Sequence, residues 1–139
     1  MKKLLLGIAA VCLAGFTFAQ DAPLWMRHSV ISPDGTTIAF TYKGDIYTVP
    51  VAGGRAMQIT TNPAYDTAPV WSPDSKRIAF ASDRMGSLDV YIVAKDGGEP
   101  RRLTTHSGSE TPLAFTDAGH VLFSAGIMPS AEAVVFPSN

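Results

Sequence analysis

The sequence has very little cysteine. Its 139 residues include one, Cys12, which lies in an apolar N-terminal run. The rest of the chain therefore has no thiol for a disulfide, for nucleophilic catalysis or for metal coordination. Its histidines, His28, His106 and His120, are scattered and lack the spacing of metal ligands. We expect no metal and no cofactor.

A basic run and a long hydrophobic run are also missing. The net charge is −1, which does not favour nucleic-acid binding. The apolar run at residues 4–18 is shorter than the roughly 20 residues that a membrane-spanning helix needs. Lys2 and Lys3 precede it and a small-x-small sequence ends it at Ala19, as in a secretory signal peptide. We expect residues 1–19 to be cleaved and the protein to be exported, periplasmic or extracellular, without membrane association.

Motifs for nucleophilic catalysis are likewise absent. The sequence has no Gly-x-Ser-x-Gly elbow. His28 beside Ser29, and His106 near Ser107 and Ser109, supply the atom types of a triad, but no spacing that favours one. We predict no catalytic residue in this chain.

An internal repeat is present instead. VISPDGTTIAF (30–40) recurs as VWSPDSKRIAF (70–80), with a weaker echo in LAFTDAGHVLF (113–123). DIYTVPVAGGRAMQITT (45–61) recurs as DVYIVAKDGGEPRRLTT (89–105), and the offset grows from 40 to 44 because a loop is longer in the second unit. A period of about 20–50 residues indicates a solenoid, a propeller or a repeat array.

Each repeat is predicted to form four short strands. Apolar and polar residues alternate as in strands in four segments, TIAFTY, DIYTVPV, RIAFAS and DVYIVA. The Ser-Pro-Asp and Gly-Gly sequences between strands are typical of turns. Four antiparallel strands per unit are the anatomy of a propeller blade. We therefore predict an all-β fold of propeller blades over residues 20–139. Blade one spans about 27–66, blade two about 67–110, and the start of blade three about 111–139.

Large apolar residues are expected to recur between the blades, because a single sheet cannot bury both of its faces. Trp71 should be buried between blades, at a position equivalent to Ile31 and Phe115. Phe40, Phe80 and Phe123 should form a second equivalent set.

The repeat resembles a known family. Its motifs resemble, in their order, the WD40-like repeat of the TolB and tricorn protease propellers: Trp-Ser-Pro-Asp, Ile-Ala-Phe, Asp-x-Tyr, Gly-Gly and Leu-Thr. PLWMRHSVISPDGTTIAFTYKGDIYTVPVAGG (23–54) resembles the opening of the first propeller in exported bacterial tricorn-type serine peptidases. FSAGIMPSAEAVVFPSN (123–139) resembles the third blade of that group.

This resemblance implies a noncatalytic propeller that gates or binds peptides for a protease core. Its implied partners are peptides or unfolded protein segments, PDZ-like and protease domains further along the same parent chain, and further copies of the parent. The parent is expected to be a serine-type peptidase, a hydrolase, although this chain is not. Because the third blade stops before an Asp-x-Tyr strand, we expect the sequence to be a fragment of a larger propeller.

Two other functions share the blade pattern. One is a periplasmic protein-binding propeller similar to TolB. The other is the propeller of a prolyl-oligopeptidase or dipeptidyl-peptidase. The downstream reading frame would separate the three.

The loops that join consecutive blades hold the candidate binding residues. Tyr65, Asp66, Ser109 and Glu110 lie on equivalent loops, which cluster on one rim of a propeller, where ligands approach. An acidic rim there would attract peptide N-termini or basic side chains; an ordinary solvated loop is the alternative. Arg84 is expected to pair with Asp83 or Asp89.

Overall fold

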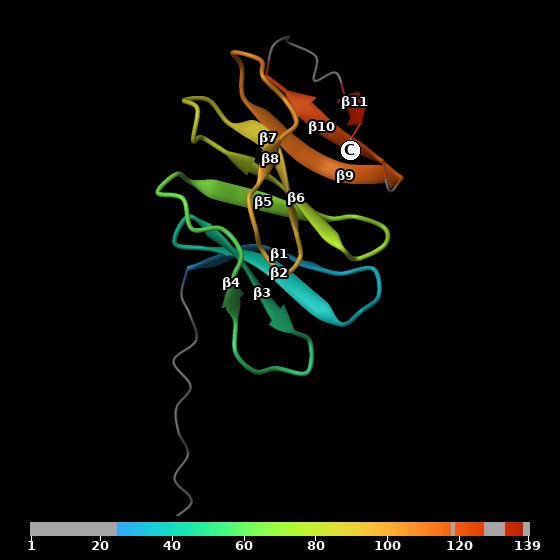
Figure 1. Cartoon of the computed structure of the whole chain (residues 1–139). Coiled ribbons are helices and arrows are strands. Elements are labelled where there is room, and N and C mark those ends of the chain that lie inside the picture. The colour runs from blue at the N-terminus through green and yellow to red at the C-terminus, as the bar shows by residue number, and fades with distance from the viewer. Residues whose placement is uncertain (1–24, 118, 127–132, 138–139) are drawn as a thin grey trace, which may run out of the picture.

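The computed structural model describes residues 25–117, 119–126 and 133–137. Their strands form three antiparallel sheets that follow one another along the chain and stack face to face (Figure 1). Two sheets have four strands and the third has three, so the predicted all-β fold of propeller blades is confirmed. The predicted signal peptide at residues 1–19 lies outside the described residues.

The strands of each sheet follow one another in chain order. Blade one contains β1 (Met26–Ile31), β2 (Thr37–Tyr42), β3 (Asp45–Pro50) and β4 (Met57–Gln58). Blade two contains β5 (Asp66–Trp71), β6 (Arg77–Ser82), β7 (Asp89–Ala94) and β8 (Arg101–Arg102). Blade three contains β9 (Glu110–Asp117), β10 (His120–Ala125) and β11 (Ala133–Pro137), with β10 in the centre. The outer strands β4 and β8 have two residues each.

The Ser-Pro-Asp turns are built by their aspartates, as the sequence predicts. The Asp34 carboxylate accepts hydrogen bonds from the Ser32 hydroxyl and from the Thr36 N–H group. These bonds lower the pKa of Asp34 to about 2. The backbone N–H group of Asp34 donates to the Ser75 hydroxyl, 3.1 Å away in the equivalent turn of blade two. The two turns therefore also connect neighbouring blades.

Each complete blade has a bulge in its inner strand. His28 in β1 and Ala68 in β5 both have a φ of 51°, at the point where the pairing register shifts. A bulge sharpens the local twist of a strand. The His28 ring lies 3.1 Å from the Thr67 hydroxyl of blade two, so the bulge of blade one also contacts the next inner strand.

The blades pack through two different faces, which we call the large face and the small face. The large face of blade two consists of Trp71, Ile78, Phe80, Tyr91 and Val93, and it packs on the small face of blade one, Val30, Ala39, Ile46 and Ile59. The small face of blade two, Val70, Ala79, Val90 and Leu103, meets Phe115, Val121, Phe123 and Ala125 of blade three. The core is therefore divided between two blade interfaces.

Trp71 is buried between blades, which confirms the prediction. Its side chain is 8% exposed, and its indole N–H group donates to the Val30 carbonyl at 3.2 Å. The strand pairs Ile31–Ile38, Trp71–Ile78 and Phe115–Val121 confirm the predicted equivalence. Ile31, however, is 58% exposed, because no other described blade packs on the large face of blade one.

Candidate functional site

One rim of the blades is formed where the inner strands begin. The loops that lead into β5 and β9 lie against the β2–β3 and β6–β7 turns. The N–H group of Asp66 donates to the Gly44 carbonyl, and that of Glu110 donates to the Leu88 carbonyl, both at 2.7 Å. The predicted site residues therefore lie on a rim built from loops and turns of consecutive blades.

The four predicted residues divide into two pairs on this rim. Tyr65 is 44% exposed and Ser109 is exposed. Asp66 and Glu110 are fully buried, which corrects the prediction of an acidic rim, because a carboxylate without solvent access does not attract a peptide from solution. Peptide contact with Tyr65 or Ser109 stays a prediction.

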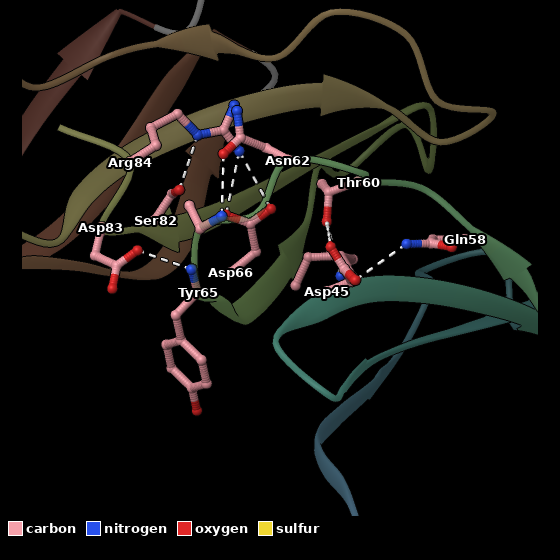
Figure 2. A network of polar contacts seen from close by, with 11 residues as sticks. Asp45, Gln58, Thr60, Asn62, Tyr65, Asp66, Ser82, Asp83 and Arg84 are labelled. Atoms are coloured by element: carbon pink, nitrogen blue, oxygen red, sulfur yellow. Dashed lines mark hydrogen bonds and ion pairs between the residues drawn. The ribbon is translucent and has the colours of Figure 1, made fainter.

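Asp66 belongs to a polar network between blades one and two, which we call the first node (Asp45, Gln58, Thr60, Asp66 and Arg84; Figure 2). The Arg84 guanidinium donates to both carboxylate oxygens of Asp66, at 3.1 and 3.2 Å, and to the Ser82 hydroxyl at 2.8 Å. It also lies 4.4 Å from the centre of the Tyr91 ring. The predicted pairing of Arg84 with Asp83 or Asp89 is thus wrong, because the longer β6–β7 loop directs Arg84 towards the start of β5.

The other part of the first node lies on blade one. Asp45 accepts hydrogen bonds from the Gln58 amide at 3.0 Å and from the Thr60 hydroxyl at 3.4 Å. The Thr60 hydroxyl in turn accepts the N–H group of Ile46. Burial, and next the nearby Asp66 carboxylate, raise the pKa of Asp45. The first node therefore holds two acids and one guanidinium across the blade interface.

A second node repeats this arrangement 44 residues later, between blades two and three, with Asp89, Arg102, Thr104 and Glu110. Here the guanidinium comes from β8, because Arg102 replaces Gln58; it forms an ion pair with Asp89 at 2.8 Å. The Thr104 hydroxyl donates to Glu110 at 3.2 Å. The ion pair reaches one carboxylate oxygen of Asp89; within the described residues, the other Asp89 oxygen and one oxygen of Glu110 are buried without a hydrogen bond.

The second node raises the pKa of Glu110. Burial raises its pKa most, and the neighbouring Asp89 carboxylate raises it further, against the effect of the Thr104 hydrogen bond. The side chain of His106 is half exposed, and its ring nitrogen lies 3.9 Å from the Glu110 carboxylate. Fewer of the carboxylate oxygens in the second node than in the first therefore accept a hydrogen bond.

The rim also contains a cavity of about 460 Å³ between blades one and two. Trp25, Arg27, Thr41, Lys43, Gly44 and Tyr65 line it. Sequence reasoning identified Tyr65 but missed Trp25, Arg27 and Lys43. Trp25 stands one residue before the inner strand of blade one, and Tyr65 stands one residue before the inner strand of blade two. Trp25 could therefore have been identified from the repeat as the equivalent of Tyr65.

No catalytic or metal-binding arrangement was found in the described part of the chain. Its His, Cys, Asp and Glu residues form no group of three that would hold a metal ion. His106 accepts the N–H group of Gly108, and His120 contacts Asp117 at 2.9 Å, so each of these rings takes part in a local turn. A search of the same residues for a helix long and apolar enough to cross a membrane found none.

Comparisons with known proteins agree on the architecture. The family described as "Tricorn protease N-terminal beta propeller domain" matches residues 23–134. "Tricorn protease homolog 1" of Streptomyces coelicolor is 35% identical over 102 residues, which are 73% of this chain and 9% of that protein. The resemblance seen in the repeats is thereby confirmed.

Solved structures show the same fold at lower identity. TolB from Acinetobacter baumannii superimposes with a TM-score of 0.70 and 21% identity, over 82% of this chain and 30% of that one. The tricorn protease superimposes with a TM-score of 0.59 and 15% identity, over 81% of this chain and 13% of that one. The chain therefore spans a small part of the length of each of these relatives.

Proposed function

Because the chain belongs to the family of tricorn protease N-terminal β-propeller domains, we propose that it is the noncatalytic propeller of an exported serine peptidase. In this role its rim binds peptides or unfolded protein segments and gates their access to a protease core of the parent protein. The family match over residues 23–134 is the observation that carries the proposal.

The structure supports a binding role for the rim in particular. Loops and turns of consecutive blades meet there, and such loops are where rigid scaffolds place their ligand contacts. A cavity of about 460 Å³ lies within the usual range of ligand sites, roughly 300–1,000 Å³. Tyr65, an exposed aromatic residue on this rim, is of the type that is enriched in interfaces.

Several parts of the proposal concern the whole parent protein. The chain covers 9% of the length of its tricorn relative, so a PDZ-like domain, a protease core and assembly of the parent into a homo-oligomer are proposed by analogy with the family. Export is proposed from the signal-like sequence of residues 1–19.

The test compares the parent protein with this chain on the same unstructured peptides. We expect the parent to hydrolyse them, and this chain to bind them without turnover. Turnover by the chain itself, abolished by His28→Ala or His106→Ala, would contradict a noncatalytic role. Failure of the chain to bind any peptide would contradict the binding role.

A protein-binding propeller similar to TolB is the second candidate. The higher TM-score with TolB, 0.70 against 0.59 for the tricorn protease, favours it. The two candidates predict different partners, because a TolB-like module acts through contacts with other proteins and a peptidase propeller meets extended substrates. Capture of a folded partner without measurable affinity for unstructured peptides would select the second candidate.

A further inference from the structure

Two aromatic residues stand at equivalent positions of consecutive blades. Trp25 precedes β1 and Tyr65 precedes β5, each by one residue. Their side chains are 61% and 44% exposed, and both line the 460 Å³ cavity on the rim. In blade three the equivalent residue is Ser109. The aromatic pair therefore marks the junction of blades one and two alone among the described junctions.

The backbone of Tyr65 is held in place by Asp83. Its N–H group donates to the Asp83 carboxylate at 2.7 Å, and its carbonyl accepts the N–H group of Asp83 at 3.3 Å. Gly44 packs so closely that a Cβ atom there would lie 3.4 Å from the Tyr65 ring. Figure 2 shows the ring pointing away from the Asp66–Arg84 pair. A loop backbone that is held in place before binding loses less entropy when a ligand arrives.

Two cations, Arg27 and Lys43, complete the lining of this cavity. Both are exposed, and no described carboxylate lies within ion-pair distance of either. Of the acids nearest in the chain to the rim loops, Asp66 is buried and paired with Arg84. Asp45 and Asp83 accept hydrogen bonds from uncharged donors and do not line the cavity. The charged side chains that line the cavity are therefore both cations, whereas the sequence predicted an acidic rim.

We propose that this cavity, which we call the aromatic–cationic pocket, binds a peptide segment in which an acidic side chain stands next to an apolar or aromatic one. Arg27 and Lys43 pair with the carboxylate, and the rings of Trp25 and Tyr65 contact the apolar neighbour. The inference rests on the proposed function, because it names the peptides that the rim selects.

The next blade junction shows what the pocket would be without these residues. Thr67 stands there at the position of Arg27, Leu88 at that of Gly44 and Ser109 at that of Tyr65. The blade scaffold is the same, but the cations and one ring are missing. The two cations and the pair of rings are thus found at the junction of blades one and two and not at that of blades two and three. A specific binding site would show this difference, whereas a feature needed for the fold would recur at both junctions.

The test measures the binding of three fluorescent peptides that are N-acetylated and C-amidated. They are repeats of Glu-Phe, Gln-Phe and Lys-Phe, so that only the residue beside each phenylalanine differs. We expect the Glu peptide to bind the purified protein on the order of 10-fold more tightly than the Gln peptide, with an affinity that falls as salt is added. Arg27→Gln and Lys43→Gln should each weaken binding about 3- to 5-fold. Tyr65→Ser, which installs the residue of blade three, should weaken it about 10-fold.

A matched control is Lys76→Gln, because Lys76 is an exposed cation in the β5–β6 turn, at the opposite end of the strands. It should leave the affinity unchanged. Equal affinity for the three peptides, or variants without effect, would overturn the pocket while leaving peptide binding by the rim in place. If no peptide binds, the pocket and the proposed function both fail.

Discussion

Replacing Arg84 by methionine tests the role of the first node. The Asp66 side chain is fully buried, and Arg84 donates to both of its carboxylate oxygens. Methionine retains an apolar stem that can lie against the Tyr91 and Phe80 rings, which the guanidinium now covers at 4.4 and 5.6 Å. The substitution therefore removes the charge and the hydrogen bonds more than it removes packing.

The magnitude follows from the burial of the partner. Removing one member of a buried ion pair typically destabilises a protein by about 3–5 kcal/mol, because the remaining charge is uncompensated. Arg84 is 11% exposed, so water reaches the pair slightly, and we expect a loss near 3 kcal/mol, the lower end of that range. Arg84→Met combined with Asp66→Asn should recover part of this loss, since no buried carboxylate is then left unpaired.

Urea unfolding followed by tryptophan fluorescence measures the effect, because Trp71 lies in the same blade interface as the first node. Arg101→Gln, a change of an exposed arginine in β8, serves as the control and should lie within about 0.5 kcal/mol of the wild type. A loss below about 1 kcal/mol for Arg84→Met, or a double variant less stable than the single one, would refute the reasoning.

Three further predictions concern single residues. Trp71→Ala should lower the free energy of unfolding by about 3–5 kcal/mol in urea titrations, since it leaves a cavity and removes the donor to the Val30 carbonyl; a loss below about 1 kcal/mol would contradict the packing described. Burial raises the pKa of Glu110 above its ordinary 4.5. Between pH 4.5 and this raised pKa the folded state binds more protons than the unfolded state, so the free energy of unfolding falls as the pH rises. Glu110→Gln should remove that decline in a pH series of urea midpoints, and an unchanged slope would count against it. Asp34 shows the opposite sign, because its pKa is lowered from 3.8 to about 2; its contribution should be lost as the pH falls through this window, and Asp34→Ala should lack that acid-dependent loss in thermal melts.

The sequence was sufficient where the structure depends on local chemistry or on the repeat. Asp34 and Asp74 form the predicted turns because their carboxylates reach N–H groups two residues away. Burial of Trp71 followed from its place in the repeat, which recurs in every blade. These predictions needed no knowledge of which segments meet across a blade interface.

Contacts between distant segments could not be predicted from local sequence in the same way. Arg84 pairs with Asp66, 18 residues earlier, and nothing local distinguishes this partner from Asp83 or Asp89. Asp66 and Glu110 were predicted on the rim because they lie on equivalent loops between blades, whereas their nodes bury them fully. The repeat did contain a signal: Asp45, Thr60 and the acid at position 66 recur 44 positions later as Asp89, Thr104 and Glu110, which is unexpected for solvated loops.

The difference between the large and small faces gives the stack of blades a direction. Two large faces placed together would force Trp71, Phe80 and Tyr91 against similar side chains and overpack the interface. Two small faces, with alanine at their centres, would leave voids. Blade surfaces of this type therefore cannot form a two-fold symmetric contact, and every contact through them is heterologous, head to tail. A blade duplicated within such a chain would therefore present a complementary face to each of its neighbours.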